Sequence, residues 1–160
     1  MYFTKSIETL EQLKKEYRRL ATTHHPDTKN GNLEIMQKIN NEYEEIFKKV
    51  KNNFINKEQE IYTKENGETP QEFINIINKL IVLYNIEIEI IGSFIWVIGE
   101  TKDHKEVLKE LNFKWHSKKL CWYLAPKSYI KRSKKNYEMD DLRNMYEVTS
   151  VKKNKQLVNL

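Results

Sequence analysis

The sequence contains little cysteine, proline or glycine: its 160 residues include one cysteine, three prolines and four glycines. Because Cys121 is the only cysteine, an intramolecular disulfide is excluded, and so is a zinc module built on four cysteines. No uninterrupted apolar run approaches the roughly 20 residues that a helix needs to cross a bilayer. The first residues also lack the apolar segment and cleavage site of a secretory signal. We therefore expect a cytoplasmic protein without a membrane partner.

Basic charge is concentrated in one region of the chain. The 28 lysines and arginines exceed the 23 acidic residues, which gives a formal net charge of +5. Residues 1–101 carry 13 basic and 16 acidic side chains, whereas residues 102–135 carry 11 basic and 3 acidic ones. A regional excess of this kind suits an anionic partner such as DNA or RNA, and it equally suits a surface that only maintains solubility.

The N-terminal third predicts two amphipathic helices. Apolar residues recur at helical spacing within residues 7–23 and again within 36–50. Pro26 should end the first helix, because the residue before a proline is pushed out of the α region. Two helices joined by a short polar loop should lie antiparallel. The first helix also carries basic side chains that are predicted to form a positive surface on adjacent turns: Lys14, Lys15, Arg18 and Arg19.

A polar stretch over residues 52–67 indicates either an extension of the second helix or a linker. Thr69-Pro70-Gln71-Glu72 is typical of a helix start, with Thr69 as the cap and Glu72 completing a capping box. The helix that follows, to about Tyr84, is apolar on more than one side. Such a helix is buried between layers or in a contact between subunits.

The remaining pattern predicts a small antiparallel sheet. Residues 86–90 and 94–98 have the period-two pattern of paired strands around a Gly92-Ser93 turn. A short helix begins at Thr101, and a second strand pair and a closing helix follow it. The predicted fold is α+β, with a helical hairpin at 1–52, a linker or helix extension at 53–68, an α+β domain with an antiparallel sheet at 69–148 and a flexible tail at 149–160.

The tripeptide His25-Pro26-Asp27 lies between the basic helix and the second helix. Together with Tyr-Arg-Arg-Leu-Ala upstream and Ile-Asn-x-x-Tyr downstream, it resembles the J-domain (DnaJ-like) co-chaperone family over roughly residues 2–50. The alternative interpretation is that Pro26 and Asp27 merely form a turn. The first helix of the family is shortened here to a few residues around Tyr2-Phe3, and neither a Gly/Phe-rich linker nor a cysteine-repeat zinc region follows.

The resemblance implies a partner and no catalytic residue in this chain. The tripeptide and the positive surface formed by Lys14, Lys15, Arg18 and Arg19 would dock on a DnaK-type (heat-shock protein 70) chaperone and stimulate its ATPase. The second half would bind a client protein. Its segments Trp96-Val97-Ile98-Gly99, Phe113-Lys114-Trp115 and Trp122-Tyr123 look similar to those of J-domain proteins of phages and mobile elements.

Aromatic and basic residues alternate in the C-terminal half. They favour a nucleic-acid or client surface on which bases stack and lysines contact phosphates, and the residues predicted for it are Trp115, Lys114, Lys118, Lys119, Lys127 and Arg132. Aromatic residues that fill a core give the same pattern, and this role suits Trp96 and Trp122 better. His104, His116 and Cys121 lack metal-ligand spacing, so we expect no metal, no cofactor and no enzymatic activity. The alternative to a co-chaperone is a nucleic-acid-binding, anti-defence or replication accessory protein of a mobile element.

Overall fold

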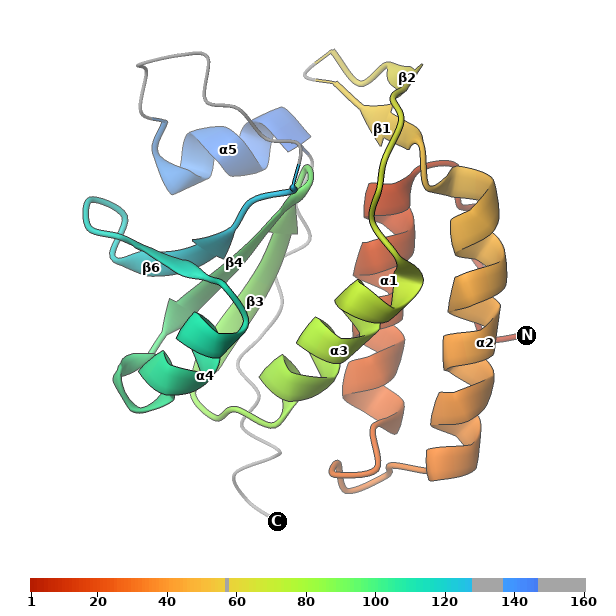
Figure 1. Ribbon diagram of the computed structural model, residues 1–160, viewed down its shortest axis with the longest axis horizontal. Coiled ribbons are helices and arrows are strands. Elements are labelled where there is room, and N and C mark those ends of the chain that lie inside the picture. Colours follow the sequence, from red (N-terminus) through yellow and green to blue (C-terminus); the bar gives the residue numbers. More distant parts are fainter. Residues whose placement is uncertain (57, 128–136, 147–160) are drawn as a thin grey trace.

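The computed structural model has an α+β fold, in which a helical hairpin is followed by an antiparallel sheet with helices on both faces (Figure 1). It describes residues 1–56, 58–127 and 137–146. In chain order the elements are α1 (Leu10–His24), α2 (Leu33–Val50), β1 (Asn53–Ile55), β2 (Ile61–Thr63), α3 (Pro70–Ile81), β3 (Ile86–Ile91), β4 (Phe94–Gly99), the 3-10 turn η1 (Lys102–His104), α4 (Lys105–Glu110), β5 (Lys114–His116), β6 (Cys121–Leu124) and α5 (Met139–Tyr146).

The antiparallel hairpin of α1 and α2 is confirmed, and local capping sets where each helix begins. The Thr9 side chain accepts a hydrogen bond from the Gln12 backbone N–H, while the Gln12 side chain accepts one from the Thr9 N–H. The Asn32 side-chain oxygen caps α2 by accepting a hydrogen bond from the Ile35 N–H. The first helix therefore starts after Thr9, later than its apolar pattern predicted, and it ends before Pro26 as expected.

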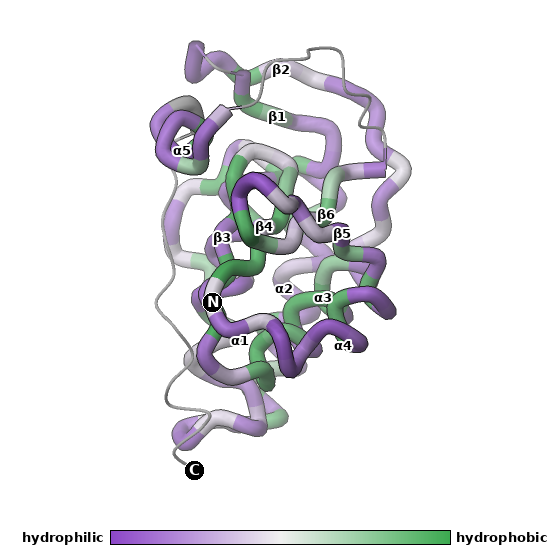
Figure 2. Tube along the Cα trace, turned by 90° about the vertical axis from the view of Figure 1, so that its left-hand side faces the viewer, coloured by the Kyte–Doolittle hydropathy of each residue, from purple (hydrophilic) through white to green (hydrophobic). Residues whose placement is uncertain are grey.

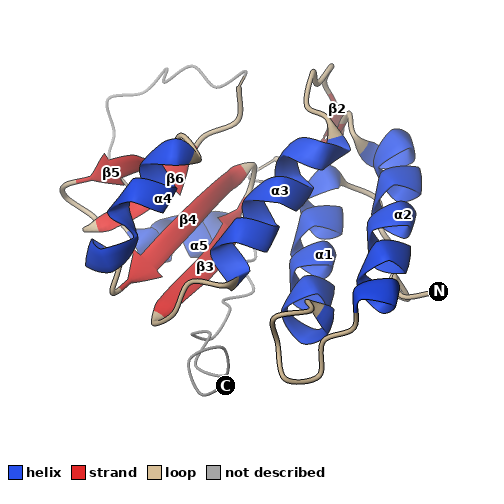
Figure 3. Cartoon of the chain, turned by 60° about the horizontal axis from the view of Figure 1, so that its bottom comes forward, coloured by secondary structure: helices blue, strands red, loops and turns tan. Residues whose placement is uncertain are grey.

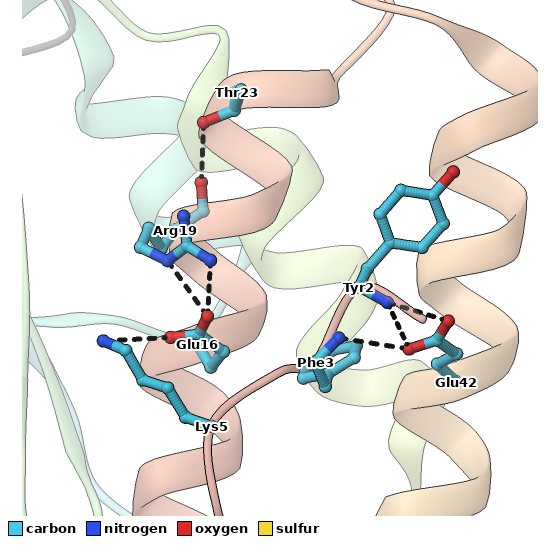
Figure 4. Close-up of polar contacts among 7 residues, drawn as sticks. All are labelled: Tyr2, Phe3, Lys5, Glu16, Arg19, Thr23 and Glu42. Atoms are coloured by element: carbon cyan, nitrogen blue, oxygen red, sulfur yellow. Dashed lines mark hydrogen bonds and ion pairs between the residues drawn. The ribbon is translucent and has the colours of Figure 1, made fainter.

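The segment before α1 forms no helix. The backbone N–H groups of Tyr2 and Phe3 donate to the Glu42 carboxylate of α2, at 2.9 Å and 3.2 Å from its Oε2 (Figure 4). Phe3 is buried in the main core. The N-terminal segment is thus attached to α2 through a carboxylate and one apolar side chain.

The stretch predicted as a helix extension or linker contains a two-stranded ribbon instead. β1 and β2 pair antiparallel, with Phe54 opposite Tyr62 and their rings stacked 5.8 Å apart. Ile61 and Tyr62 are exposed. This ribbon lies at the end of the hairpin opposite to the loop between α1 and α2 (Figure 1).

Helix α3 lies between the hairpin and the sheet, as its apolar character on several sides predicted. Phe73 and Ile77 are fully or almost fully buried in a core that includes residues of α1, α2 and the sheet. The predicted capping box is wrong, because the Thr69 side chain makes no capping hydrogen bond. Glu72 forms an ion pair with Lys127 instead, at 2.6 Å between Oε1 and Nζ.

The four-stranded sheet is antiparallel throughout and has the order β3-β4-β6-β5. Both predicted strand pairs are confirmed. Gly92 at the first turn and Asn112 before β5 adopt positive φ angles of 59° and 68°. Glycine pays no steric cost there, and asparagine tolerates this region better than most residues.

Helices α3 and α4 cover one face of the sheet and α5 covers the other (Figure 3). Hydrophobic residues are concentrated along β3, β4 and α3, whereas α5 is mostly hydrophilic (Figure 2). A two-point ion pair attaches α5 to the sheet: Arg143 Nε and Nη2 lie 2.8 Å and 2.6 Å from the carboxylate of the fully buried Glu89. The geometry matches the fork-to-carboxylate pairing that arginine favours.

Within the described residues, no helix combines the length and the apolar composition that a membrane crossing requires.

Candidate functional site

The loop that joins α1 to α2 is held by hydrogen bonds to its own backbone. The carbonyl oxygen of His25 accepts from the Thr28 N–H at 2.9 Å and from the Thr28 hydroxyl at 2.7 Å. The loop closes where the Asn32 N–H donates to the His24 carbonyl at 3.0 Å. Because Pro26 has a fixed φ as well, the tripeptide is presented in one backbone conformation.

Gly31 permits this closure because it lies directly against the tripeptide. A Cβ atom at position 31 would lie 1.8 Å from the carbonyl oxygen of His25 and 2.9 Å from the Cα of Pro26. These neighbours are backbone atoms, so they cannot move aside as a flexible side chain would. Any larger residue at position 31 would therefore displace the His25-Pro26 backbone.

Two features of its surroundings favour the neutral form of the His25 imidazole. Its Nδ1 accepts a hydrogen bond from the Asp27 backbone N–H at 3.1 Å, which suits the tautomer with the proton on Nε2. Burial lowers the pKa of His25 below its ordinary value, and the nearby Asp27 carboxylate offsets part of that shift. Nδ1 also lies 3.7 Å from the Asp27 carboxylate, a contact that is an ion pair only when the imidazole is protonated.

Pro26 and Asp27 face solvent, and a pocket lies beside them. The Asp27 side chain is 65% exposed and the His25 side chain 12%. The pocket has a volume of about 200 Å³, and its walls come from the loop, from α2 and from α3: His25, Pro26, Leu33, Met36, Gln37, Asn40 and Asn78. The site is accessible from outside on the end of the hairpin.

The predicted positive surface of α1 is wrong for Lys14. The Lys14 residue is only 7% exposed, and its ammonium lies 2.8 Å from a Glu68 carboxylate oxygen and 5.1 Å from the centre of the Phe73 ring. Both partners belong to the segment that leads into and forms α3. The second half of the chain therefore covers this side of the helix and neutralises its charge.

The prediction also fails for Arg18, which is 3% exposed. Its Nε and Nη2 atoms are buried and have no hydrogen-bond partner among the described residues, and burial lowers the pKa of Arg18 to about 9. A buried guanidinium without a partner disfavours folding, since its lost hydration is not replaced. Arg18 cannot contact an outside protein in this arrangement.

Lys15 and Arg19 are paired with carboxylates of their own helix. Lys15 lies 2.9 Å from Glu11, which also accepts a hydrogen bond from the Gly92 N–H at the turn between β3 and β4. Arg19 has the most exposed side chain of the four, at 52%, and its Nε donates to Glu16 at 3.0 Å (Figure 4). Although burial opposes the effect, Arg19 and Lys5 hold the pKa of Glu16 below its usual value.

The second predicted surface is brought together in part, on the β5–β6 hairpin. Trp115 is 46% exposed, with its ring 5.6 Å from that of Trp122. Lys114 and Lys118 are exposed and Lys119 is half-buried. Lys127 is instead paired with Glu72, and Arg132 lies outside the described residues.

The other aromatic and reactive side chains have structural positions. Trp96 and Trp122 are buried, as expected, and the Trp122 indole donates to the Thr101 hydroxyl at 3.1 Å. Cys121 is buried, and burial raises its thiol pKa to about 11, which disfavours the reactive thiolate. His104 Nε2 lies 3.0 Å from the Tyr84 carbonyl oxygen. Within the described parts of the chain, no cluster of three or more histidines, cysteines and carboxylates could hold a metal ion.

The sequence interpretation missed the acidic partners of α1 and the contribution of α3 to the pocket. One signal for the partners existed, because acidic residues outnumber basic ones in residues 1–101. The multi-sided apolar pattern of α3 gave a second signal, since a helix buried between layers must cover part of a neighbour. No pattern marked Asn78 itself.

We compared the chain with protein-family models, with curated proteins and with solved structures, and none of them matches.

Proposed function

We propose that the chain is a co-chaperone that binds a DnaK-type chaperone through the His25-Pro26-Asp27 loop and stimulates its ATPase. The observation that carries the proposal is a tripeptide held by backbone hydrogen bonds at the end of an antiparallel hairpin, with Pro26 and Asp27 exposed to solvent. A loop already held in one conformation loses little entropy on docking. The exposed Asp27 carboxylate can accept charge-assisted hydrogen bonds from a partner arginine.

Under this proposal the ATP chemistry belongs to the partner, and the chain needs no catalytic group or cofactor of its own. The second half would bind a client protein. This division of roles suits a cytoplasmic protein, and the proposal includes that location.

The experiment is the steady-state ATPase rate of a bacterial DnaK-type chaperone with increasing concentrations of this protein. We expect the wild-type chain to raise the rate severalfold and Asp27→Asn to leave it at the basal value. Glu45→Gln is the matched control, because it also removes one carboxylate from the hairpin but lies on an exposed turn of α2 far along the sequence from the loop. A flat response to the wild-type protein would overturn the proposal.

A second candidate is nucleic-acid binding by the β5–β6 hairpin, which is favoured by the exposed Trp115 between lysines. Bases could stack on the indole while Lys114 and Lys118 contact phosphates. If this holds, Lys118→Glu with Lys119→Glu abolishes a salt-sensitive shift of labelled single-stranded DNA or RNA. Lys48→Glu with Lys49→Glu, another adjacent pair on the other half of the chain, should leave the shift unchanged. Absence of binding by the wild-type protein at low salt would eliminate this candidate.

A further inference from the structure

Lys14 and Arg18 of α1 are buried, and Glu68 and Phe73 cover Lys14, whereas the Arg19 side chain remains 52% exposed in its ion pair with Glu16. Exposing Lys14 requires α3 to separate from α1. Because Phe73, Ile77 and Leu80 of α3 are at most 1% exposed, separation would transfer several apolar side chains into water. Both halves of the chain also share one continuous core. A partner that binds the folded chain therefore cannot pair with Lys14 or Arg18 and must contact another surface.

The pocket beside the tripeptide offers such a surface, and it is built by both halves of the chain. His25 and Pro26 come from the loop, Leu33 from the first turn of α2, and Asn78 from α3. At about 200 Å³ it has room for about seven water molecules, which is the scale of one long side chain. A protein that grips the tripeptide would lie across its opening.

The pocket combines apolar walls with amide groups. Pro26, Leu33 and Met36 supply the apolar part. The Tyr17 hydroxyl donates to Asn40 Oδ1 at 2.8 Å, and Asn78 Nδ2 donates to the Ile74 carbonyl at 2.8 Å. These bonds orient both amides, so that Asn40 retains an N–H donor and Asn78 an oxygen acceptor, neither of them bonded to another described residue.

None of the described residues that line the pocket is an acid, a lysine or an arginine. The one titratable side chain among them, His25, accepts a hydrogen bond at Nδ1, which favours its neutral form. A charged group placed there would lose its hydration without gaining a counter-charge. The pocket therefore suits an uncharged side chain with an apolar stem and an end that both donates and accepts.

We infer, on the basis of the function proposed above, that the DnaK-type chaperone inserts a glutamine or asparagine side chain into this pocket. Its amide would donate to Asn78 and accept from Asn40, while its stem packs on Pro26 and Leu33. Asn78 is then a specificity-determining residue, although it lies on α3, outside the hairpin that carries the tripeptide. The docking surface is the end of the hairpin together with α3, and the buried Lys14 and Arg18 of α1 take no part.

The test uses the full chain and measures both its Kd for the chaperone and the stimulated ATPase rate. Asn78→Ala removes the acceptor, and we expect Kd to rise about tenfold, the effect of one lost hydrogen bond. Asn75→Ala is the matched control, because it removes the same amide from an exposed position of the same helix and does not line the pocket.

Asn78 also lies 3.5 Å from the Tyr17 hydroxyl, so Asn78→Ala can weaken the fold as well as the pocket. Leu33→Asp is therefore a second, independent test of the pocket. Leu33 is 62% exposed, and an acidic residue is favourable in the first turn of a helix. Leu33→Asp should leave the thermal midpoint of unfolding unchanged and still raise the Kd for the chaperone about tenfold, since it places a charge at the pocket opening. Arg18→Leu, on the covered side of α1, should leave Kd unchanged.

The outcomes separate this inference from the proposed function. If the wild-type chain stimulates the ATPase and Asp27→Asn does not, but both pocket variants bind like the wild type, the pocket inference alone is overturned. It is also overturned if Arg18→Leu weakens binding as much as the pocket variants do. If the wild-type chain neither binds nor stimulates the chaperone, both proposals fail together.

Discussion

The end of the helical hairpin and the basic side of its first helix differ sharply in exposure, although about two helical turns separate Arg18 from His25. At the end, Pro26 and Asp27 are exposed to solvent. On the side, Lys14 and Arg18 are buried against the second half of the chain. A sequence motif thus predicts only part of the exposed surface, because tertiary packing determines which side of a helix remains accessible.

The largest expected effect concerns the buried side of α1. Glu68→Gln removes the counter-charge of Lys14, whose side chain is 8% exposed, and leaves a buried ammonium without its ion pair. We expect a loss of about 3 kcal/mol in the free energy of unfolding, measured by urea denaturation. Glu65→Gln, in the same segment but exposed, is the control and should change stability little. Equal stability of the two variants would contradict the importance of this ion pair.

The second prediction concerns the exposed end. Gly31→Ala should cost about 2 kcal/mol, since its Cβ collides with the His25 backbone and the loop must shift. It should also reduce ATPase stimulation, because the tripeptide moves. Gly67→Ala is the control, as nothing lies within 4 Å of a Cβ at that position. Thermal denaturation of the two variants measures the difference, and a Gly31→Ala protein as stable as Gly67→Ala would show that the loop is loosely held.

The third prediction is that leucine raises the free energy of unfolding when it replaces Arg18 and lowers it when it replaces Arg19. Arg18→Leu replaces a buried guanidinium, two of whose nitrogens have no partner, with an apolar side chain, so we expect a gain of about 1 kcal/mol. Arg19→Leu, one position further along, breaks the pair between the exposed Arg19 side chain and the buried Glu16, which Lys5 also contacts, and should cost about 0.5 kcal/mol. Urea denaturation distinguishes the two, and a destabilised Arg18→Leu protein would mean that the guanidinium contributes favourably.

The smallest effect is a titration at the exposed end. Burial lowers the pKa of His25, so the folded chain binds fewer protons than the unfolded chain between that value and the ordinary pKa of about 6.5. The contribution of His25 to stability is therefore present above pH 6.5 and is lost as the pH falls through this window. NMR titration of the imidazole should give a midpoint below 6.5, and a lower one in Asp27→Asn. A midpoint unchanged by Asp27→Asn would exclude the electrostatic contact.

Much of the fold followed from local patterns in the sequence. The period of apolar residues located both helices of the hairpin and both strand pairs, and Pro26 and Gly92 marked the turns. The capping box at Thr69 and the exposure of Lys14 were wrong because both depended on partners distant in sequence, Lys127 for Glu72 and Glu68 for Lys14. The ribbon of β1 and β2 pairs residues at most ten positions apart, and the polar pattern of this stretch did not indicate it.

The amino-acid order alone determined the tripeptide, its place after a helix stopped by Pro26 and the antiparallel return of the chain, because backbone sterics and apolar periodicity act over a few residues. Only the tertiary structure decided that Glu68 and Phe73 cover Lys14, that Arg18 is buried and that Asn78 lies beside His25 and Pro26. The physical reason is that burial and ion pairing depend on which distant elements pack together, and the shared apolar core determines that packing.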